Sequence, residues 1–450
     1  MDKTLLASFF SPDQAYVVAK APGRLDVMGG IADYSGSLVL QKAIKETTTV
    51  AIALRHDGVV RIKSLTADKA DLQTTFLYQD LLKNRQEVDY AIAREQVKKI
   101  QGGDWASYVV GCFLVLQKEK GIVVSGADIL ITSDVPVGKG VSSSAALEVA
   151  TMKALKELYP LTFEPTELPR LAQKVENLIV GAPCGLMDQL ASYFGNHSHL
   201  LPILCQPDIV HAPVAIPAGI YFVGIDSGIR HSVGDASYSD VRAAAYMGYS
   251  MIVREKGITN EQLAHAKTQR DFLQLPYQGY LANITPAEFE ASYAQKLLYR
   301  MAGHYFIRHY PVHPDPVTTV EEEKFYAILD CTRHPVYENF RVKTFLLLLQ
   351  YLATGLNQQS RIQCLEQLGE LMYQSHTSYS ICGLGNPHTD ELVEMVKQNR
   401  NKGVYGAKIT GGGSGGTVCV LCDGAEGLQT AHTIHQQYQE KHRKSVKFFE

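Results

Sequence analysis

The segment from residue 136 to residue 146 combines small residues and hydroxyls in an arrangement suited to binding a polyphosphate. Its sequence is PVGKGVSSSAA, between a predicted strand and a predicted helix. Glycines permit a close approach of the backbone, and the free N–H groups and the dipole at the start of a helix favour a phosphate. A β-turn with a well-capped helix is the alternative, and no G-K-[ST] closes the segment as in a Walker A loop. The residues expected to contact a polyphosphate are Gly138, Gly140, Ser142, Ser143, Ser144 and Ala145.

A second glycine-rich segment covers residues 408 to 416, with the sequence KITGGGSGG. It lies between two strand-like stretches, AKIT and TVCVLC, which leaves it too short for a linker. One interpretation is a tight hairpin between the two strands. The other is a loop that packs against the phosphate site or the acceptor, with Gly412 and Gly413 as the contacting residues.

A single acid stands among apolar neighbours in the sequence GLMDQ, residues 185 to 189. A carboxylate within hydrogen-bond reach of an alcohol can accept its proton as a general base. Asp188 is therefore a candidate catalytic residue. The alternative is that Asp188 caps the start of a helix.

The elements that must position these residues mix strands and helices without a strict β-α-β alternation, which predicts the α+β class. Strand patterns cover residues 14–21, 47–56, 125–133 and 219–226, and the C-terminal stretches AKIT, TVCVLC and VKFF. Helical patterns cover residues 142–157, 166–180, 235–255, 336–353, 360–378, 387–399 and 428–440.

The length of 450 residues is too great for one compact core, so two domains are expected. We place them at residues 1–215 and 216–450, with an insertion at about 270–335 that is rich in Tyr, His and Pro. The formal net charge of -3 predicts neither a nucleic-acid nor a membrane surface. The N-terminus lacks the apolar run of a signal peptide.

The eight cysteines include one C-x-x-C pair, Cys419 and Cys422, inside a predicted strand. An offset of three residues on a strand points the two side chains to opposite faces. We therefore expect buried apolar packing rather than a metal or redox site. Together these features favour a reducing, cytoplasmic compartment.

The three chemical segments, in this order, resemble the GHMP kinase superfamily and in detail the galactokinase-like sugar kinases. PGRLDVMGGIADY, residues 22–34, is similar to the galactokinase opening P-G-R-V-N-L-I-G-E-H-x-D-Y. ENLIVGAPCGLMDQ, residues 176–189, is similar to E-H-x-F-A-G-x-P-C-G-I-M-D-Q. The resemblance runs from about residue 15 to the C-terminus.

This resemblance implies a fold and a set of roles. The N-terminal domain would be like the second domain of ribosomal protein S5 and the C-terminal domain ferredoxin-like, with ATP, Mg²⁺ and a small-molecule sugar as ligands. The implied catalytic residues are Asp188 and Arg24, and the implied magnesium residues are Ser144 and Glu176. Trp105 would lie near the adenine, unless it is a core residue. The implied sugar residues are Asp33, Asp26, Gly30, Ile31, Gly185 and Tyr238, although the spacing from Tyr238 to Arg242 is one residue longer than in galactokinases.

One departure from the family pattern concerns the sugar. Gly30 and Ile31 replace the Glu-His pair that, in galactokinases, helps to hold the C6 hydroxymethyl group. L-Arabinopyranose has the hydroxyl stereochemistry of galactose at C2, C3 and C4 but lacks that group. The sequence around these residues also resembles that of the kinase domain of plant L-arabinokinases, so we expect L-arabinose 1-phosphate as product. A galactokinase or broad sugar 1-kinase is the alternative. A non-catalytic sugar sensor is a remote one, since the phosphate loop, Arg24 and Asp188 are all present.

Overall fold

The computed structural model describes residues 1–66, 72–230, 236–269 and 271–450. The chain forms two compact units: unit 1 comprises residues 1–24, 43–137 and 142–195, and unit 2 comprises residues 25–42, 138–141 and 196–450. This division falls at residue 195 rather than at the expected residue 215, because the strand His199–Leu204 pairs with Leu38–Gln41 of unit 2. Residues 235 and 270, where a helix and the insertion were expected to begin, lie outside the described residues.

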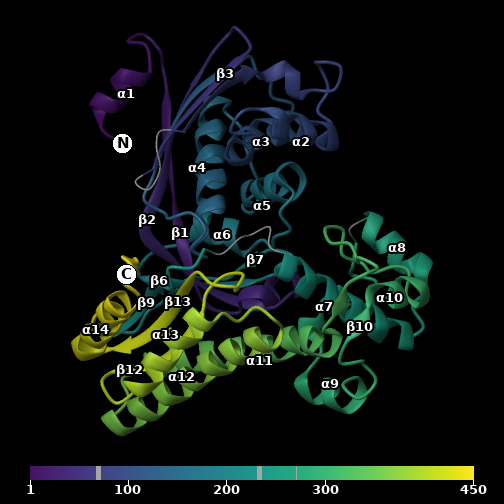
Figure 1. The fold of residues 1–450 in the computed structure, drawn as a ribbon, viewed down its shortest axis with the longest axis vertical. Helices are drawn as coiled ribbons and strands as arrows, with labels where there is room; N and C mark the ends of the chain where they lie inside the picture. Colours follow the sequence, from purple (N-terminus) through teal and green to yellow (C-terminus); the bar gives the residue numbers. More distant parts are fainter. Residues whose placement is uncertain (67–71, 231–235, 270) are drawn as a thin grey trace. The chain divides into compact units, whose positions relative to one another are not determined.

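Unit 1 is a sheet with helices on one face and a short helix on the other (Figure 1). Its strands follow the order β4-β3-β5-β2, with β1 paired to β2; β3 and β5 pair in parallel, whereas β2 with β5 and β3 with β4 pair antiparallel. The strands are β1 (Val17–Met28), β2 (Leu38–Leu54), β3 (Val59–Thr66), β4 (Leu72–Leu77) and β5 (Ala127–Ser133), of which β1 and β2 continue into unit 2. The helices are α1 (Lys3–Phe9), α2 (Tyr90–Lys99), α3 (Gly103–Lys120), α4 (Ser143–Leu158), α5 (Glu167–Lys174), the π-helical turn Val175–Val180 and α6 (Met187–Phe194).

The core of unit 1 forms because β2 and β5 alternate between their two faces. Val50 and Ile52 of β2 pack with the helix α3, whose residues from Val109 to Leu116 are buried. Ala51 and Ala53 face the other way and pack with Leu6 of α1. Val149, Ala150 and Leu155 of α4 pack into the same core as α3.

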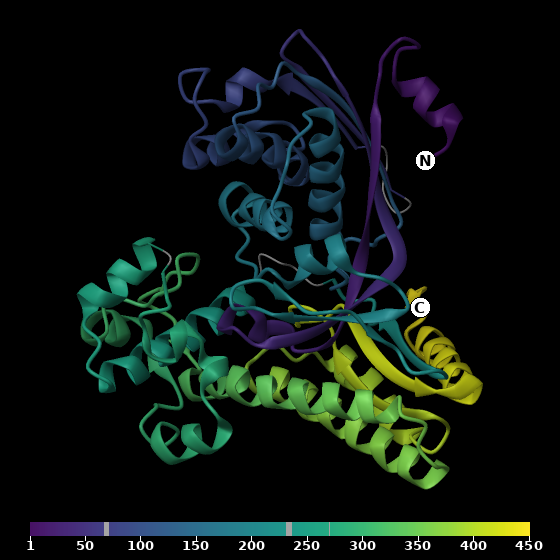
Figure 2. The same cartoon turned by 180° about the vertical axis from the view of Figure 1, so that it is seen from behind.

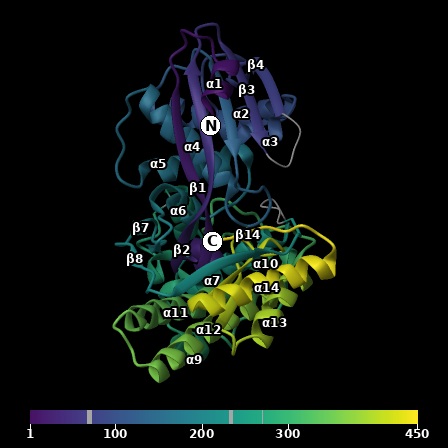
Figure 3. The same ribbon diagram turned by 90° about the vertical axis from the view of Figure 1, so that its left-hand side faces the viewer.

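Unit 2 contains an antiparallel sheet, β12-β13-β9-β14, between two layers of helices. Leu421 and Cys419 of β13 face a core shared with α11 and α12, whereas Val420 and Cys422 face a core shared with α13 and α14. Figure 2 shows α11 and α12 side by side, and Figure 3 shows α14 with α13 next to it. The elements are β9 (Ile220–Asp226), β12 (Val404–Ile409), β13 (Thr417–Asp423), β14 (Phe448–Phe449), α11 (Ile328–Leu352), α12 (Gln358–Ile381), α13 (Pro387–Gln398) and α14 (Gly424–His442).

The remainder of unit 2 surrounds an apolar cluster that includes Ile31, Tyr34 and Tyr379. Part of it is the segment expected to be an insertion, whose Phe289, Tyr293 and Phe306 are buried in this cluster. The elements are the 3-10 helix Gly30–Ser35, β6 (His199–Leu204), β7 (Ile209–Val210), β8 (Val214–Ala215), α7 (Ala236–Glu255), α8 (Asn260–Gln269), α9 (Pro286–Ser292), β10 (Met301–Ala302), α10 (Gly303–His309) and β11 (Phe325–Tyr326).

The α+β class is confirmed, and Cys419 and Cys422 lie on opposite faces of β13 as expected. All eight cysteines are buried, and none of them forms a disulfide within the described residues. Across the ranges that the structure describes, none of the helices combines the length and the apolarity that a membrane crossing needs.

Candidate active site

Arg24 and Asp188 form a two-bond ion pair in unit 1. The Arg24 Nε and one terminal nitrogen donate to the two oxygens of Asp188, each at 2.9 Å. Arg24, at the end of the unit 1 part of β1, is 2% exposed, whereas the Asp188 side chain is 24% exposed. The guanidinium thus orients a carboxylate that a substrate can still reach. The N-cap alternative is wrong, because Leu186 occupies the cap position of α6 and Asp188 is the second helical residue.

The loop before α6 is held in place by side chains of the preceding helical segment. The Asn177 side chain accepts a hydrogen bond from the backbone N–H of Cys184 at 2.9 Å. Gln173 donates to the carbonyl of Cys184 at 3.2 Å. Gly185, a predicted sugar contact, therefore lies half-exposed in a fixed loop three residues before Asp188.

Two buried carboxylates from different helices meet at Gln189, the residue after Asp188. The Gln189 side-chain amide donates to Glu148 of α4 at 3.1 Å and to Glu176 at 2.9 Å. Burial and then the charge of Asp188 raise the pKa of Glu176 to about 7, although a hydrogen bond from Ser144 lowers it. Burial, and next the charge of Glu176, hold the pKa of Glu148 well above its usual value. Ser144 and Glu176, predicted to act together, are thus in contact.

Glu148 was missed by the sequence analysis. It lies four residues after Ser144 in α4, and residues with this spacing share one face of a helix. The available signal was an acidic residue directly before two apolar residues of a helix, Val149 and Ala150, which are buried in the structure.

The raised pKa of Glu176 predicts a pH-dependent stability. Its pKa is about 7 in the folded chain against the ordinary glutamate value of 4.5, so the folded state keeps a proton that the unfolded state releases. Its contribution is favourable below pH 4.5 and is lost as the pH rises through about 7. Between pH 5 and pH 8 we expect the free energy of unfolding of the wild type to fall on the order of 2 kcal/mol relative to that of Glu176→Gln. Denaturant unfolding in EDTA without nucleotide measures this difference.

The control for this experiment is Glu157→Gln, which changes an exposed acid of the same unit. Its unfolding free energy should follow wild type at every pH. Parallel curves for wild type and Glu176→Gln would contradict the raised pKa.

The start of α4 has an unsatisfied hydroxyl. Ser142 occupies the cap position with φ 60° but its side chain makes no capping bond. Its hydroxyl oxygen is buried and has no hydrogen-bond partner within the described residues. Ser143 and Ser144 are partly exposed, and Ala145 is buried. Since buried polar groups are normally bonded, and helix starts favour anions, this end of α4 fits a phosphate.

The two glycine-rich segments touch within unit 2, where residues 138–141 belong. Thr417 donates from its hydroxyl to the carbonyl of Lys139 at 2.8 Å. A Cβ at Gly416 would lie 2.9 Å from the same carbonyl oxygen, so only glycine fits there. Lys139 itself pairs with Asp226 at 3.0 Å. The loop that includes Gly138 and Gly140 is therefore braced by the second segment.

The second segment also connects β12 to β13, so the hairpin interpretation holds together with the packing one. A Cβ at Gly413 would lie 2.7 Å from the Leu384 Cβ, which places this glycine against the end of α12. Gly413 thus serves packing within unit 2. For Gly412, a nucleotide contact stays a prediction.

Asp26 is the centre of a buried polar network in unit 2. It is fully buried, and its carboxylate accepts from the Gly30 N–H at 3.0 Å, from the Gln41 amide at 2.8 Å and from the Lys408 ammonium at 2.6 Å. Both oxygens are engaged by internal donors. These bonds position the Gly30 backbone, and the substrate-binding role of Asp26 stays a prediction.

Gly30 and Ile31 are held by Tyr379 of α12. The Ile31 N–H donates to the Tyr379 hydroxyl at 2.9 Å, and this hydroxyl donates to the Gly411 carbonyl at 3.0 Å. Gly30 has φ +39°, and a Cβ there would overlap the Tyr379 hydroxyl. The Ile31 side chain is 1% exposed within the apolar cluster. Two positions that carry hydrogen-bonding side chains in galactokinases are thus filled by apolar contacts and a tyrosine.

The remaining predicted residues lie in both units. Asp33 is 4% exposed and accepts from the Tyr34 N–H at 2.7 Å. The Tyr238 ring packs edge-on against Tyr34 at 6.1 Å, while Arg242 forms a buried ion pair with Asp315 at 2.8 Å. Trp105 in unit 1 is half-buried against the α3–α4 core, as its core-residue alternative expects.

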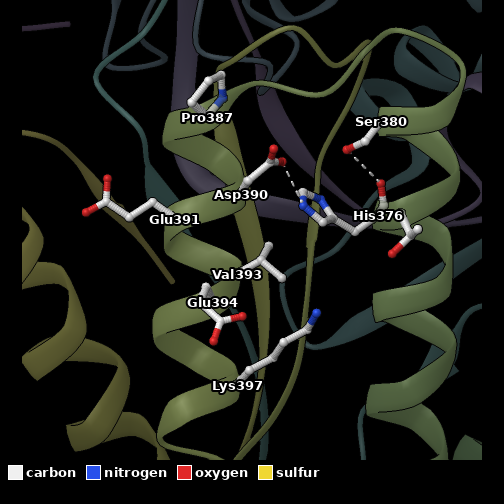
Figure 4. A pocket seen from close by; sticks show the side chains of 9 residues that line it. His376, Ser380, Pro387, Asp390, Glu391, Val393, Glu394 and Lys397 are labelled. Carbon is white, nitrogen blue, oxygen red and sulfur yellow. Dashed lines mark hydrogen bonds and ion pairs between the residues drawn. The ribbon is translucent and has the colours of Figure 1, made fainter.

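Ser375 and His376 of α12 help to hold two backbone segments, at Gly29 and at Ile409. Ser375 donates to Glu338 at 2.7 Å, and Glu338 accepts from the Gly29 N–H at 3.1 Å. His376 accepts from the Ile409 N–H at 3.3 Å and lies 3.1 Å from Asp390 across a groove (Figure 4). Burial lowers the pKa of His376 to about 4. Both ring nitrogens are engaged, so His376 is a structural residue.

Three parts of the chain match described families. Residues 6–54 match the galactokinase galactose-binding signature, residues 107–196 the GHMP kinases N-terminal domain, and residues 353–440 the GHMP kinases C-terminal domain. The chain belongs to the GHMP kinase family. This is a family of ATP-dependent kinases, and the pair of Arg24 and Asp188 lies in the N-terminal part of the GHMP kinase fold.

Individual relatives include sugar kinases. The GHMP kinase chain is 42% identical to L-arabinokinase of Arabidopsis thaliana over 93% of its own length, but spans only 44% of that protein. It is 29% identical to a galactokinase of Chloroflexus aggregans, covering 90% of this chain and 84% of the relative. Lactococcus lactis galactokinase complexed with galactose has the same fold, with TM-score 0.71, 22% identity and coverage of 99% and 95% of the two chains.

Proposed function

We propose that this chain is an ATP-dependent sugar 1-kinase, and the observation that carries the proposal is the two-bond pair of Arg24 and Asp188. The anomeric oxygen attacks the γ-phosphorus, the bond to the β-phosphate oxygen breaks, and the anomeric proton passes to the Asp188 carboxylate. The products are a sugar 1-phosphate and ADP. Arg24 orients the base, which raises the fraction of encounters with reacting geometry.

The residues present also fit Mg²⁺ and ATP. A buried Ser142 hydroxyl without a hydrogen-bond partner in the described residues lies at the start of α4, and the Ser144 side chain is hydrogen-bonded to Glu176 in the same unit. Mg²⁺ prefers oxygen ligands of this kind and keeps much of its coordination for phosphate and water. When bound with ATP, it neutralises phosphate charge. Ser144 and Glu176 would hold it, and the α4 N-terminus would bind the phosphates.

Replacing Glu176 by Gln should raise the Mg²⁺ concentration needed for half-maximal rate. The change removes one anionic ligand while it keeps an oxygen for Gln189 to contact. We expect a shift of several-fold, measured by ADP release at fixed ATP and varied Mg²⁺. Glu157→Gln is the matched control on α4 and should leave the curve unchanged. A wild-type magnesium curve for Glu176→Gln would remove it from the metal site.

For the sugar, we propose L-arabinose. The support is that Gly30 and Ile31 offer no side-chain partner for a C6 hydroxyl, and that Tyr379 occupies the space a larger residue at position 30 would need. A hydroxyl left without a partner costs about 1–3 kcal/mol. Galactose is the second candidate, because residues 6–54 match the galactose-binding signature and most of the named relatives are galactokinases.

A coupled ADP-release assay over L-arabinose, D-galactose, D-glucuronate, D-xylose and L-fucose tests the proposal. We expect the highest kcat/KM with L-arabinose and a 1-phosphate as product, identified by phosphorus NMR. No ADP release above the sugar-free rate with any of the five sugars would overturn the kinase proposal. A 6-phosphate product would overturn the assignment of the anomeric hydroxyl.

A further inference from the structure

Three side chains that can bind a metal converge between α13 and α14 of unit 2. They are His388, Glu391 and His442, and one ligand atom from each lies within 4.8 Å of the others. His388 and Glu391 are three residues apart and so share a face of α13, and His442 is the last residue of α14. Figure 4 shows Glu391 on α13 beside Asp390, among the residues that line the groove of His376.

The distances are close to those of ligands that share one ion. His442 Nε2 lies 2.9 Å from Glu391 Oε2, and the rings of His388 and His442 have centroids 4.9 Å apart. Zinc binds imidazole nitrogen and carboxylate oxygen at about 2.0–2.2 Å, so two ligands of one tetrahedral ion lie about 3.3–3.6 Å apart. All three residues are partly buried. Small side-chain rotations therefore suffice to bring the three atoms around a single centre.

A buried tyrosine fixes which nitrogen of His388 is free. The Tyr438 hydroxyl donates to the carbonyl of Ser227 at 2.9 Å, and it lies 3.0 Å from His388 Nδ1. A hydroxyl has one proton to donate, and a carbonyl can only accept, so His388 Nδ1 must be the donor in the second contact. Nε2 is then the nitrogen with the free lone pair. Metal-binding histidines are commonly oriented in this way by a partner of the other ring nitrogen.

Two charged groups act on the cluster in opposite ways: the Glu391 carboxylate can bind a cation, and the nearby Lys441 ammonium repels one. The two carboxylate oxygens of Glu391 face different groups: Oε1 lies 2.7 Å from the Lys441 ammonium and Oε2 lies 2.9 Å from His442 Nε2. Lys441 is 2.7 Å from Glu391 and its side chain is 66% exposed. An exposed lysine can turn into water when a dication takes its place. The Lys441 charge should nevertheless weaken metal binding.

We propose that His388, Glu391 and His442 form a binding site for one divalent transition-metal ion, with Zn²⁺ as the ion that two imidazoles and one carboxylate favour. Water completes the coordination. The ion joins the C-terminal end of α14 to α13, and it is distinct from the magnesium expected with ATP. The site has no part in the proposed phosphoryl transfer, so its test does not depend on catalytic activity.

The test uses the full chain, treated with EDTA and then freed of it, and titrated with Zn²⁺ against a chromophoric chelator. We expect one Zn²⁺ per chain, and a rise in Tm on its addition. The double variant His388→Ala with His442→Ala should bind at least about tenfold more weakly and lose the Tm response. Its control removes two exposed histidines of the same unit, His265→Ala with His304→Ala, and should bind as wild type does.

Two further variants change groups that do not contact the ion. Tyr438→Phe removes only the hydroxyl that orients His388, and affinity should fall about 10–100-fold. Lys441→Gln removes the competing charge, and affinity should rise several-fold. Absorption bands of bound Co²⁺ report the same site directly. The absence of a stoichiometric site, or equal affinity in wild type and the His388/His442 double variant, would overturn the proposal.

Discussion

Replacing Asp188 by Asn lowers kcat for sugar phosphorylation by about 100-fold or more, with folding and ATP binding retained. In the proposed reaction the carboxylate accepts the anomeric proton, and an amide of the same shape cannot do so at neutral pH. Because the side chain is partly exposed and is held by two hydrogen bonds from Arg24, the loss should fall on kcat rather than on KM for ATP. Steady-state kinetics with ADP release measures both constants.

The control for this variant must separate chemistry from stability. Asp188→Asn leaves the buried Arg24 without its counter-charge, and breaking a buried pair is destabilising, so Tm and nucleotide affinity are measured alongside the rate. Asp104→Asn is the matched change, since it also removes a carboxylate from the first turn of a helix in unit 1. It should keep wild-type kcat. Near-normal turnover by Asp188→Asn would show that another group, or none, removes the proton.

We expect L-arabinose to exceed D-galactose in kcat/KM by roughly 10–200-fold, the range that a lost hydrogen bond and a crowded methylene produce together. The position of the galactokinase Glu-His pair is closed by Ile31 and Tyr379, and neither offers a partner for the C6 hydroxyl. The comparison needs only the wild-type chain and two sugars. Equal or better turnover of galactose would leave a galactokinase with an altered C6 pocket.

The structure also predicts which variants cannot test this preference. Gly30→Glu with Ile31→His would place a side chain on the Tyr379 hydroxyl, so we expect a loss of stability rather than a new specificity. Ile31→Ala creates space without a clash and should narrow the preference by raising the relative efficiency with galactose. Ile203→Ala, a buried change in β6, controls for the general cost of a cavity. An unchanged sugar ratio in Ile31→Ala would mean that Ile31 does not set the preference.

Much of the candidate site could be predicted because its residues are recognisable within short segments. Asp188 and Ser144 were expected from local patterns and Arg24 and Glu176 from the family resemblance, and the structure brings them together as two contacting pairs. Tyr379 was missed because its contact with Ile31 spans 348 residues of sequence. No spacing rule relates such distant positions. The same holds for Lys408, whose charge is needed only because Asp26 is buried opposite it.

Among the secondary-structure predictions, two helices were found where they were expected, but their first or last residues differ from the prediction. The helix expected at 336–353 begins at Ile328, because Pro335 is tolerated inside α11 where a local rule would end the helix. The helix expected at 166–180 changes to a π-helical turn at Val175, which places Glu176 beside Gln189. Tertiary contacts decide both cases, and they are not visible in a local window.

The overlap between position 30 and Tyr379 constrains how this chain could change its substrate over generations. Any side chain at Gly30 meets the tyrosine hydroxyl, so a glutamate there is unacceptable until Tyr379 has already been replaced. Replacing Tyr379 first gives up its bonds to Ile31 and Gly411 without any gain for galactose. Effects of residues in contact do not add, so every single step between the two states is unfavourable. A glutamate at position 30 therefore requires at least two coordinated substitutions, one of them at Tyr379.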